Sequence, residues 1–153
     1  MQYPWTEEVA VRTYTPPKDK PPATEVGVRI DLLTMTREMS EGVPFQLAEE
    51  IRTLLDLNKT SFARKLGVDP RTLSRFRKSG RLNALASDRV YRLASLVEAA
   101  TELHEGDQVR AIRWLKTPNR ALGDRRPIDA IASQPDYERA MDLIGALQEG
   151  VFV

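Results

Sequence analysis

Four polar side chains in the middle of the chain share one spacing and could contact a polyanion. They are Arg71, Ser74, Arg75 and Lys78. Separations of three and four residues place all of them on one side of a helix, away from Leu73 and Phe76. Arginine and lysine on such a face can pair with guanine edges or phosphates in a major groove. The alternative is a basic, solvated helix in an ordinary bundle, and between the two we predict contact with DNA.

Two short helices around a tight turn must position these side chains. The pattern predicts helices over Lys59–Leu66 and Pro70–Lys78. Ala63 lies where the helices approach most closely, and Gly67 can adopt the positive φ that ends the first helix. Asp69 is a suitable N-cap for the second helix. A small residue followed four positions later by glycine is typical of a helix-turn-helix.

Residues around the second helix extend the predicted DNA surface. Asn58 offers a cap to the first helix, where two hydroxyls could donate to a phosphate. The segment 79–86, read as a loop, would carry one further arginine near the duplex. The complete predicted set is Thr60, Ser61, Arg71, Thr72, Ser74, Arg75, Lys78 and Arg81.

Charge is distributed unevenly along a chain of 153 residues whose net charge is only +1. Residues 59–92 hold 10 basic and 2 acidic residues, whereas acidic residues outnumber basic ones in 1–58 and in 93–153. A positive middle between acidic flanks suits a segment that binds a polyanion. The start lacks the pattern of a signal peptide, and no apolar run approaches the roughly 20 residues that span a bilayer. We expect a cytoplasmic protein without a membrane partner.

No group of residues in the sequence suits catalysis or metal binding. The chain has no cysteine, which excludes disulfides and thiolate ligands. Its only histidine, His104, falls in the last turn of a predicted helix, where a histidine interacts favourably with the helix dipole. A catalytic or metal-binding role would need partners for His104, and the sequence offers no nucleophile, base and oxyanion or metal group together. We predict no enzymatic activity, no cofactor and no metal.

The segments before and after the helix-turn-helix have different character. Prolines interrupt residues 1–25, which predicts an extended arm that either lies loosely on the surface or docks on another chain. Residues 26–41 fit either a strand or a helix, and 44–56 fit an amphipathic helix. A long helix over 87–104, capped by Ser87, has more apolar surface than one small domain requires. It either joins two halves of the protein or forms the seam of a dimer.

The C-terminal third predicts a second helical module. A helix ends at Trp114-Leu115 because of the following Thr117-Pro118, and Pro127 opens a short helix that Pro135 ends. The final helix spans Tyr137–Glu149, and Gly150 caps it. The apolar tail after this helix is typical of a segment docked on its own domain or on a partner.

A family resemblance rests on residues of this third and of the segment before it. In the C-terminal third they are Ala111, Trp114-Leu115, Pro118-Asn119, Ala121-Leu122-Gly123, Pro127, Leu147 and Gly150, and before it Gly80-Arg81-Leu82, Ser87-Asp88-Arg89 and Arg92-Leu93-Ala94. Residues 43–150 thereby resemble the antitoxins of the Xre/MbcA/ParS family. The resemblance implies a bacterial type II antitoxin whose partner is a RES-domain toxin, an enzyme that depletes NAD. It also implies direct binding that blocks the toxin's active site, and repression of the operon through the helix-turn-helix.

The combined expectation is an all-α protein: a Cro/repressor-like helix-turn-helix domain, then a small toxin-binding domain. We predict an arm over 1–42, the DNA-binding domain over 43–104 and the toxin-binding domain over 105–153. Operator DNA and the toxin are the predicted partners, with a homodimer inside a larger hetero-oligomer. The alternative is a stand-alone helix-turn-helix regulator with a dimerisation or effector domain. The predicted toxin-binding residues are Tyr137, Met141, Ile144, Gln148, Val151, Phe152 and Val153.

Overall fold

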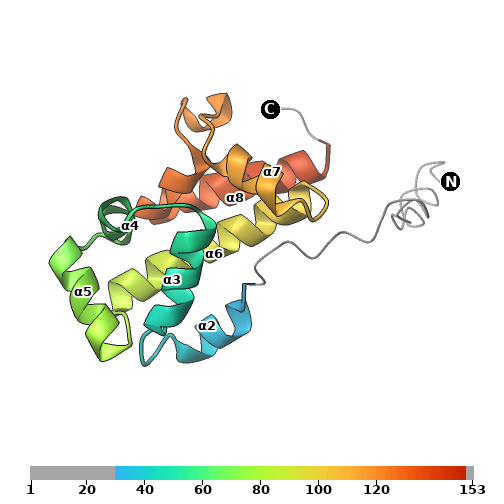
Figure 1. The fold of residues 1–153 in the computed structure, drawn as a ribbon. Helices are drawn as coiled ribbons and strands as arrows, with labels where there is room; N and C mark the ends of the chain where they lie inside the picture. The colour runs from blue at the N-terminus through green and yellow to red at the C-terminus, as the bar shows by residue number, and fades with distance from the viewer. Residues whose placement is uncertain (1–29, 151–153) are drawn as a thin grey trace, which may run out of the picture.

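The computed structural model describes residues 30–150, and in this range the chain is helical, with two isolated β-bridges and no strand. This confirms the all-α prediction (Figure 1). The α-helices are α2 (Leu32–Glu38), α3 (Phe45–Leu54), α4 (Lys59–Leu66), α5 (Pro70–Ser79), α6 (Ala84–Leu103), α7 (Gln108–Leu115) and α8 (Gln134–Gln148). Two 3-10 helices, η1 (Arg120–Leu122) and η2 (Pro127–Ala132), lie between α7 and α8.

Helix α6 is the central element of the fold. It runs through the body in Figure 1 and packs against α2, α3 and α4 on the N-terminal side and α7, η2 and α8 on the C-terminal side. The side chains of its apolar stripe, including Val90, Leu93 and Val97, are fully buried by the same chain. The helix therefore joins the two halves of the protein, one of the two predicted alternatives, and this stripe is not available to a second copy.

The start of α6 also differs from the prediction. Asn83 caps the helix by accepting a 2.9 Å hydrogen bond from the backbone N–H of Ala86. Ser87, the predicted cap, is instead fully buried inside the first turns and accepts a 2.9 Å hydrogen bond from the backbone N–H of Val43. The loop predicted over 79–86 therefore ends at Asn83, which is the cap of α6. The Ser87 oxygen is not available for capping, because it accepts the hydrogen bond from Val43, 44 residues earlier in the chain.

Part of the predicted arm belongs to the folded body. Residues 26–41, which fitted a strand or a helix, contain α2, and the side chain of Asp31 caps it by accepting a hydrogen bond from the N–H of Thr34. Met35 of α2 is 1% exposed and belongs to the common core. The rest of the predicted arm, residues 1–29, lies outside the described residues.

The loop before α3 pairs with the loop after α5. Leu82 donates its N–H to Val43 O at 3.0 Å, and Phe45 donates to Gly80 O at 2.8 Å. Gly42 has a φ of +92°, and a Cβ there would lie 2.1 Å from Leu82 O. Both the backbone conformation and the close approach therefore require glycine at this position. This junction holds the end of the helix-turn-helix against the first part of the chain.

The C-terminal module keeps the predicted order of elements, with shifted boundaries. Helix α8 begins at Gln134 rather than Tyr137, because Ser133 caps it by accepting a 3.2 Å hydrogen bond from the N–H of Asp136. Pro135 consequently lies in the first turn of α8, a position that tolerates proline, and does not end the short helix before it. The predicted corner before this helix ends at Gly123, whose φ is +68°.

Candidate DNA-binding and partner-binding surfaces

The helix-turn-helix has the geometry that its sequence predicts. The side chain of Asn58 accepts a 2.8 Å hydrogen bond from Ser61 N–H and caps α4, and Gly67 ends that helix with a φ of +72°. Asp69 caps α5 by accepting a 2.6 Å hydrogen bond from Thr72 N–H, with Pro70 in the first turn. The inner faces of both helices are buried, through Phe62, Ala63, Leu66, Leu73 and Phe76.

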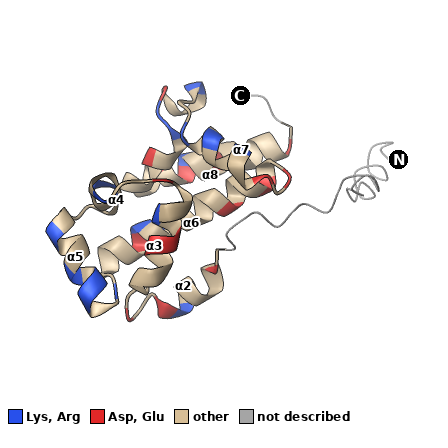
Figure 2. Ribbon diagram, viewed as in Figure 1, with Lys and Arg blue, Asp and Glu red and all other residues tan. Residues whose placement is uncertain are grey.

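The outer face of α5 is exposed and cationic. Arg71, Arg75 and Lys78 point to solvent, and Figure 2 shows basic positions along α5. Among the described residues none of these three side chains is in an ion pair with a carboxylate. Arg75 Nη2 instead donates a 3.0 Å hydrogen bond to the hydroxyl of Thr72. These guanidinium and ammonium groups therefore remain available to an external anion, with no direct ion pair in the described part of the chain.

The cap of α5 is the carboxylate closest to this face. Hydrogen bonds from the backbone and side chain of Thr72, with the nearby charges of Arg75 and Arg71, hold the pKa of Asp69 below its usual value. Asp69 is thus ionised at neutral pH, as an N-cap should be. Ser74, a predicted DNA contact, donates its hydroxyl to Pro70 O at 3.2 Å while remaining exposed.

Three predicted contacts lie outside α5. Thr60 is exposed and Ser61 half-buried at the start of α4. Arg81, by contrast, forms an ion pair with Glu38 at 2.5 Å and donates to Gly42 O at 2.9 Å. The Arg81 guanidinium therefore stabilises the junction between α2 and α5, while its side chain stays 41% exposed, and its role as a DNA contact stays a prediction.

The predicted partner-binding residues divide into three groups. Gln148 is exposed and Tyr137 and Met141 are half-buried on α8, so all three have surface available to another chain. Ile144 is 1% exposed and packs in the core, so its prediction as a contact residue is wrong. Its position on the stripe that faces α6 explains this burial. Val151–Val153 lie outside the described residues.

Polar contacts join the helix-turn-helix to the C-terminal module. Lys65 of α4 forms a 2.5 Å ion pair with Asp129 of η2, and its side chain is 11% exposed. Arg126 also donates to the Asp129 carboxylate, at 2.9 and 3.1 Å. Arg89 of α6 donates to Lys65 O at 3.2 Å, across the same joint. Together with the shared core, these contacts fix the two modules relative to each other.

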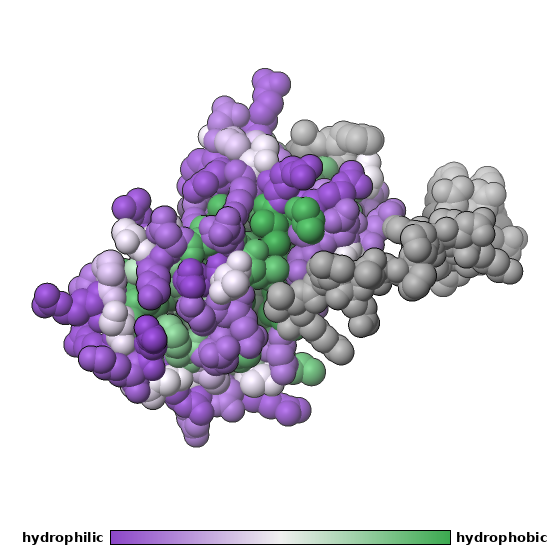
Figure 3. Space-filling view, in the orientation of Figure 1, coloured by the Kyte–Doolittle hydropathy of each residue, from purple (hydrophilic) through white to green (hydrophobic). Residues whose placement is uncertain are grey.

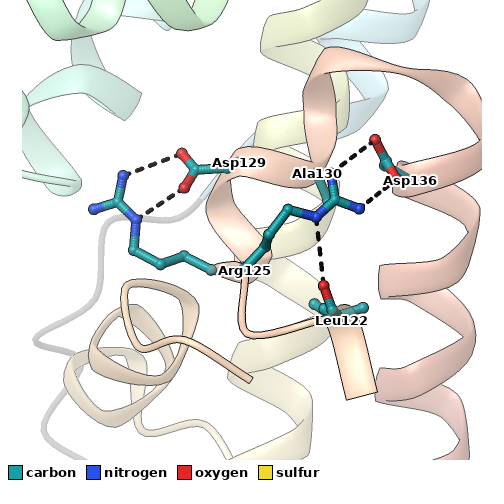
Figure 4. Close-up of a pocket in the computed structure, with 6 residues that line it drawn as sticks. Leu122, Arg125, Asp129, Ala130 and Asp136 are labelled. Atoms are coloured by element: carbon teal, nitrogen blue, oxygen red, sulfur yellow. Dashed lines mark hydrogen bonds and ion pairs between the residues drawn. The ribbon is translucent and has the colours of Figure 1, made fainter. Parts of the chain in front are cut away.

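A small cavity beneath η1 and η2 is filled by its own polar network (Figure 4). Arg125 donates to both carboxylate oxygens of Asp136, at 3.2 and 2.6 Å, and to Leu122 O at 3.4 Å. Hydrogen bonds from Arg125 and Ser133 lower the pKa of Asp136 to about 2. The space left is about 10 Å³, enough for a water molecule at most. This network orders the corner before α8.

The described residues hold no metal-binding cluster and no membrane-spanning helix. In residues 30–150 no three histidine or acidic side chains cluster as metal ligands. No helix in that range has the length and apolar character needed to cross a bilayer. His104, the only histidine, packs edge-on against Trp114 at 6.3 Å between ring centroids. The described surfaces that remain as candidate sites are the cationic face of α5 and the outer surface of α8.

Comparison with known proteins assigns both modules. Residues 37–95 match the antitoxin Xre-like helix-turn-helix domain, and residues 99–150 match the antitoxin Xre/MbcA/ParS C-terminal toxin-binding domain. The chain is 31% identical to an antitoxin Xre of Yersinia enterocolitica, over 86% of this chain and 85% of that protein. It is 28% identical to an antitoxin Xre of Photorhabdus laumondii, over 74% and 77% of the two chains. It is 35% identical to the mycobacterial cidal antitoxin MbcA of Mycobacterium tuberculosis, over 56% of this chain and 74% of MbcA.

Proposed function

The chain belongs to the Xre/MbcA/ParS antitoxin family, and from this premise we propose that it neutralises a RES-domain toxin and represses its own operon. Such a toxin depletes NAD, and the antitoxin blocks the toxin's active site by direct binding. The observation that supports the proposal is the coexistence of two surfaces in one folded body with a shared core. One is a cationic face on the helix-turn-helix, without ion-pair partners among residues 30–150, and the other belongs to the toxin-binding domain, which packs against α6.

DNA recognition is proposed to use α5 as the recognition helix. Arg71 and Arg75 lie on its exposed face, at a spacing of one helical turn, and neither side chain forms an ion pair with another residue of 30–150. Lys78 continues this face by one further turn and suits a phosphate. The hydroxyls of Thr60 and Thr72 are placed at the two helix starts, where phosphates commonly bind.

Operator binding by single variants tests this assignment. Arg71→Ala or Arg75→Ala should weaken binding by about 1–3 kcal/mol for each lost base contact, roughly 5- to 150-fold. Lys78→Ala should weaken binding to all DNA sequences alike. It should also reduce the slope of log affinity against log salt concentration by about 1. The measurement is a titration of the promoter fragment by electrophoretic shift at several salt concentrations. Arg37→Ala, an exposed arginine on α2, is the matched control. Unchanged affinity in both α5 variants would refute the recognition-helix assignment.

Neutralisation is proposed to use the outer surface of α8 and the tail beyond it. Gln148 is exposed near the end of α8, and the Tyr137 ring lies beneath the guanidinium of Arg92 at 5.6 Å, which fixes its orientation. Deleting Val151–Val153 should weaken protection of cells that express the toxin. The double substitution Met141→Ala with Gln148→Ala should do the same. Growth and cellular NAD measure that protection, and Gln46→Ala on α3 is the control. Full protection by the truncated chain would refute the role of the tail.

Homodimerisation also stays a proposal, and it needs a surface other than the buried stripe of α6. Among residues 30–95, two large apolar side chains are exposed, Leu33 of α2 at 73% and Leu85 in the first turn of α6 at 50%. Sedimentation of the purified chain, alone and with the toxin, measures the oligomeric state. A monomer at all concentrations, with Leu85→Ser indistinguishable from the wild type, would count against it.

A further inference from the structure

Helix α7 exposes a face that nothing in the described chain covers. Ala111 and Leu115 are fully buried against the core, whereas Val109 on the opposite side is 62% exposed. Following the circumference of the helix from Val109, the next side chains are Arg113 and Arg110, both exposed, and then Trp114, which is half-buried. In the region where Figure 1 places α7, Figure 3 shows hydrophobic side chains reaching the surface between hydrophilic ones.

A groove of about 300 Å³ runs along this face. Its lining comes from His104, Arg110, Arg113, Trp114 and Thr117. The exposed lining is mostly apolar, so the groove offers a hydrophobic floor with two guanidinium groups at its rim. His104 Nε2 is buried beside the groove and has no hydrogen-bond partner among the described residues. Buried polar atoms are normally satisfied, so this nitrogen indicates an incomplete surface.

The groove has a definite charge preference. Neither Arg110 nor Arg113 forms an ion pair through its side chain in residues 30–150. Burial, and next the charge of Arg110, lower the pKa of His104, and the carboxylate of Asp107 opposes this only in part. The imidazole is therefore neutral at pH 7 and leaves the two arginines as the charges of the groove. Guanidinium groups bind carboxylates and phosphates through paired hydrogen bonds, so the groove suits an anionic partner.

We propose that this α7 groove is a docking surface for an acidic segment of the toxin. A carboxylate of that segment sits between Arg110 and Arg113, and a neighbouring apolar side chain packs on Trp114 and Val109. Tryptophan and arginine are the residues that most often carry binding energy at interfaces. The inference rests on the proposed function. It adds a second toxin-contacting surface, on α7, to the one proposed on α8. A protein segment fits better than DNA, because the floor is apolar and α6, about 30 Å long at 1.5 Å per residue, separates α7 from α5.

Charge reversal tests the groove with the purified chain and the toxin encoded beside its gene. Arg110→Glu with Arg113→Glu should weaken toxin binding at least tenfold and reduce its salt dependence, while operator affinity stays unchanged. Both side chains are exposed, so the variant should fold; circular dichroism checks this. Each single reversal, Arg110→Glu or Arg113→Glu, is also compared with Arg37→Glu, a control of equal charge change at a distant exposed site. A second variant carries a photo-crosslinking phenylalanine in place of Val109, and mass spectrometry of the adduct should identify a toxin peptide containing Asp or Glu.

The outcomes separate this inference from the proposed function. Toxin affinity unchanged by the double reversal would overturn the docking surface while leaving neutralisation intact. A loss of operator affinity instead would assign the groove to DNA and overturn it equally. Crosslinks only to residues 1–29 of the same chain, or to a second copy, would also overturn it. If the wild-type chain binds no toxin, the proposed function fails, and this inference fails with it.

Discussion

Replacing Ser87 by alanine should destabilise the fold by more than the loss of one hydroxyl suggests. Ser87 Oγ accepts a 2.9 Å hydrogen bond from Val43 N–H, and both residues are 0% exposed. Alanine leaves that N–H buried, and water cannot reach it. An unsatisfied buried donor costs about 1–3 kcal/mol, so we expect the free energy of unfolding to fall by that amount. Helix propensity, which favours alanine by a few tenths of a kcal/mol, offsets little of it.

Equilibrium urea unfolding followed by circular dichroism measures this change. The matched control is Ser95→Ala in the same helix, where the hydroxyl donates at 2.9 Å to Tyr91 O, a carbonyl within the helix itself. No buried group loses its only partner there, so the control should stay within about 0.5 kcal/mol of the wild type. Equal stability of the two variants would show that Val43 N–H finds another acceptor, and the argument from burial would fail.

Two further predictions concern the junction and the η1–η2 corner. Gly42→Ala should lower the free energy of unfolding by about 2–5 kcal/mol, because the new Cβ meets the Leu82 carbonyl and the positive φ is strained. Gly106→Ala is the control, because its φ is +87° but its surroundings are open, and it should lower this free energy by only about 1 kcal/mol. Equal losses of stability in thermal unfolding would refute the clash. Asp136→Asn should destabilise the protein at pH 7. Because the folded-state pKa of Asp136 is about 2, below its usual 3.8, the wild-type advantage should persist above pH 4 and vanish as the pH falls through 2. A difference in urea midpoint that stays constant between pH 7 and 2 would contradict this.

The helix-turn-helix was predictable because its determinants are local. Asn58, Gly67, Asp69 and Pro70 each act within a few residues of their own position, and each is found in its predicted role. Capping chemistry and the steric freedom of glycine therefore suffice to fix both helices.

The errors arose where distant residues decide between local alternatives. Asn83 and Ser87 are both able to cap α6, and the donor that claims the serine lies 44 residues earlier. Arg81 also forms a 2.5 Å ion pair with Glu38 of α2, a contact that its own sequence neighbours do not indicate. Ile144 follows Tyr137 and Met141 at helical spacing, which suggests a shared surface. The buried stripe of α8, however, is wide enough to include Ile144 beside Ala140 and Leu143. Periodicity alone does not give the width of that stripe.

The shared core has a consequence for how the two activities are lost. Residues from Met35 to Ile144 form one continuous hydrophobic cluster, and Lys65 and Asp129 tie the halves together on its edge. Neither half can be removed without exposing the interior of the other, since α6 supplies side chains to both. Under the proposed function, a single proteolytic cut within α6 should therefore end repression and neutralisation in the same event, so that the operon is derepressed at the moment the toxin is released.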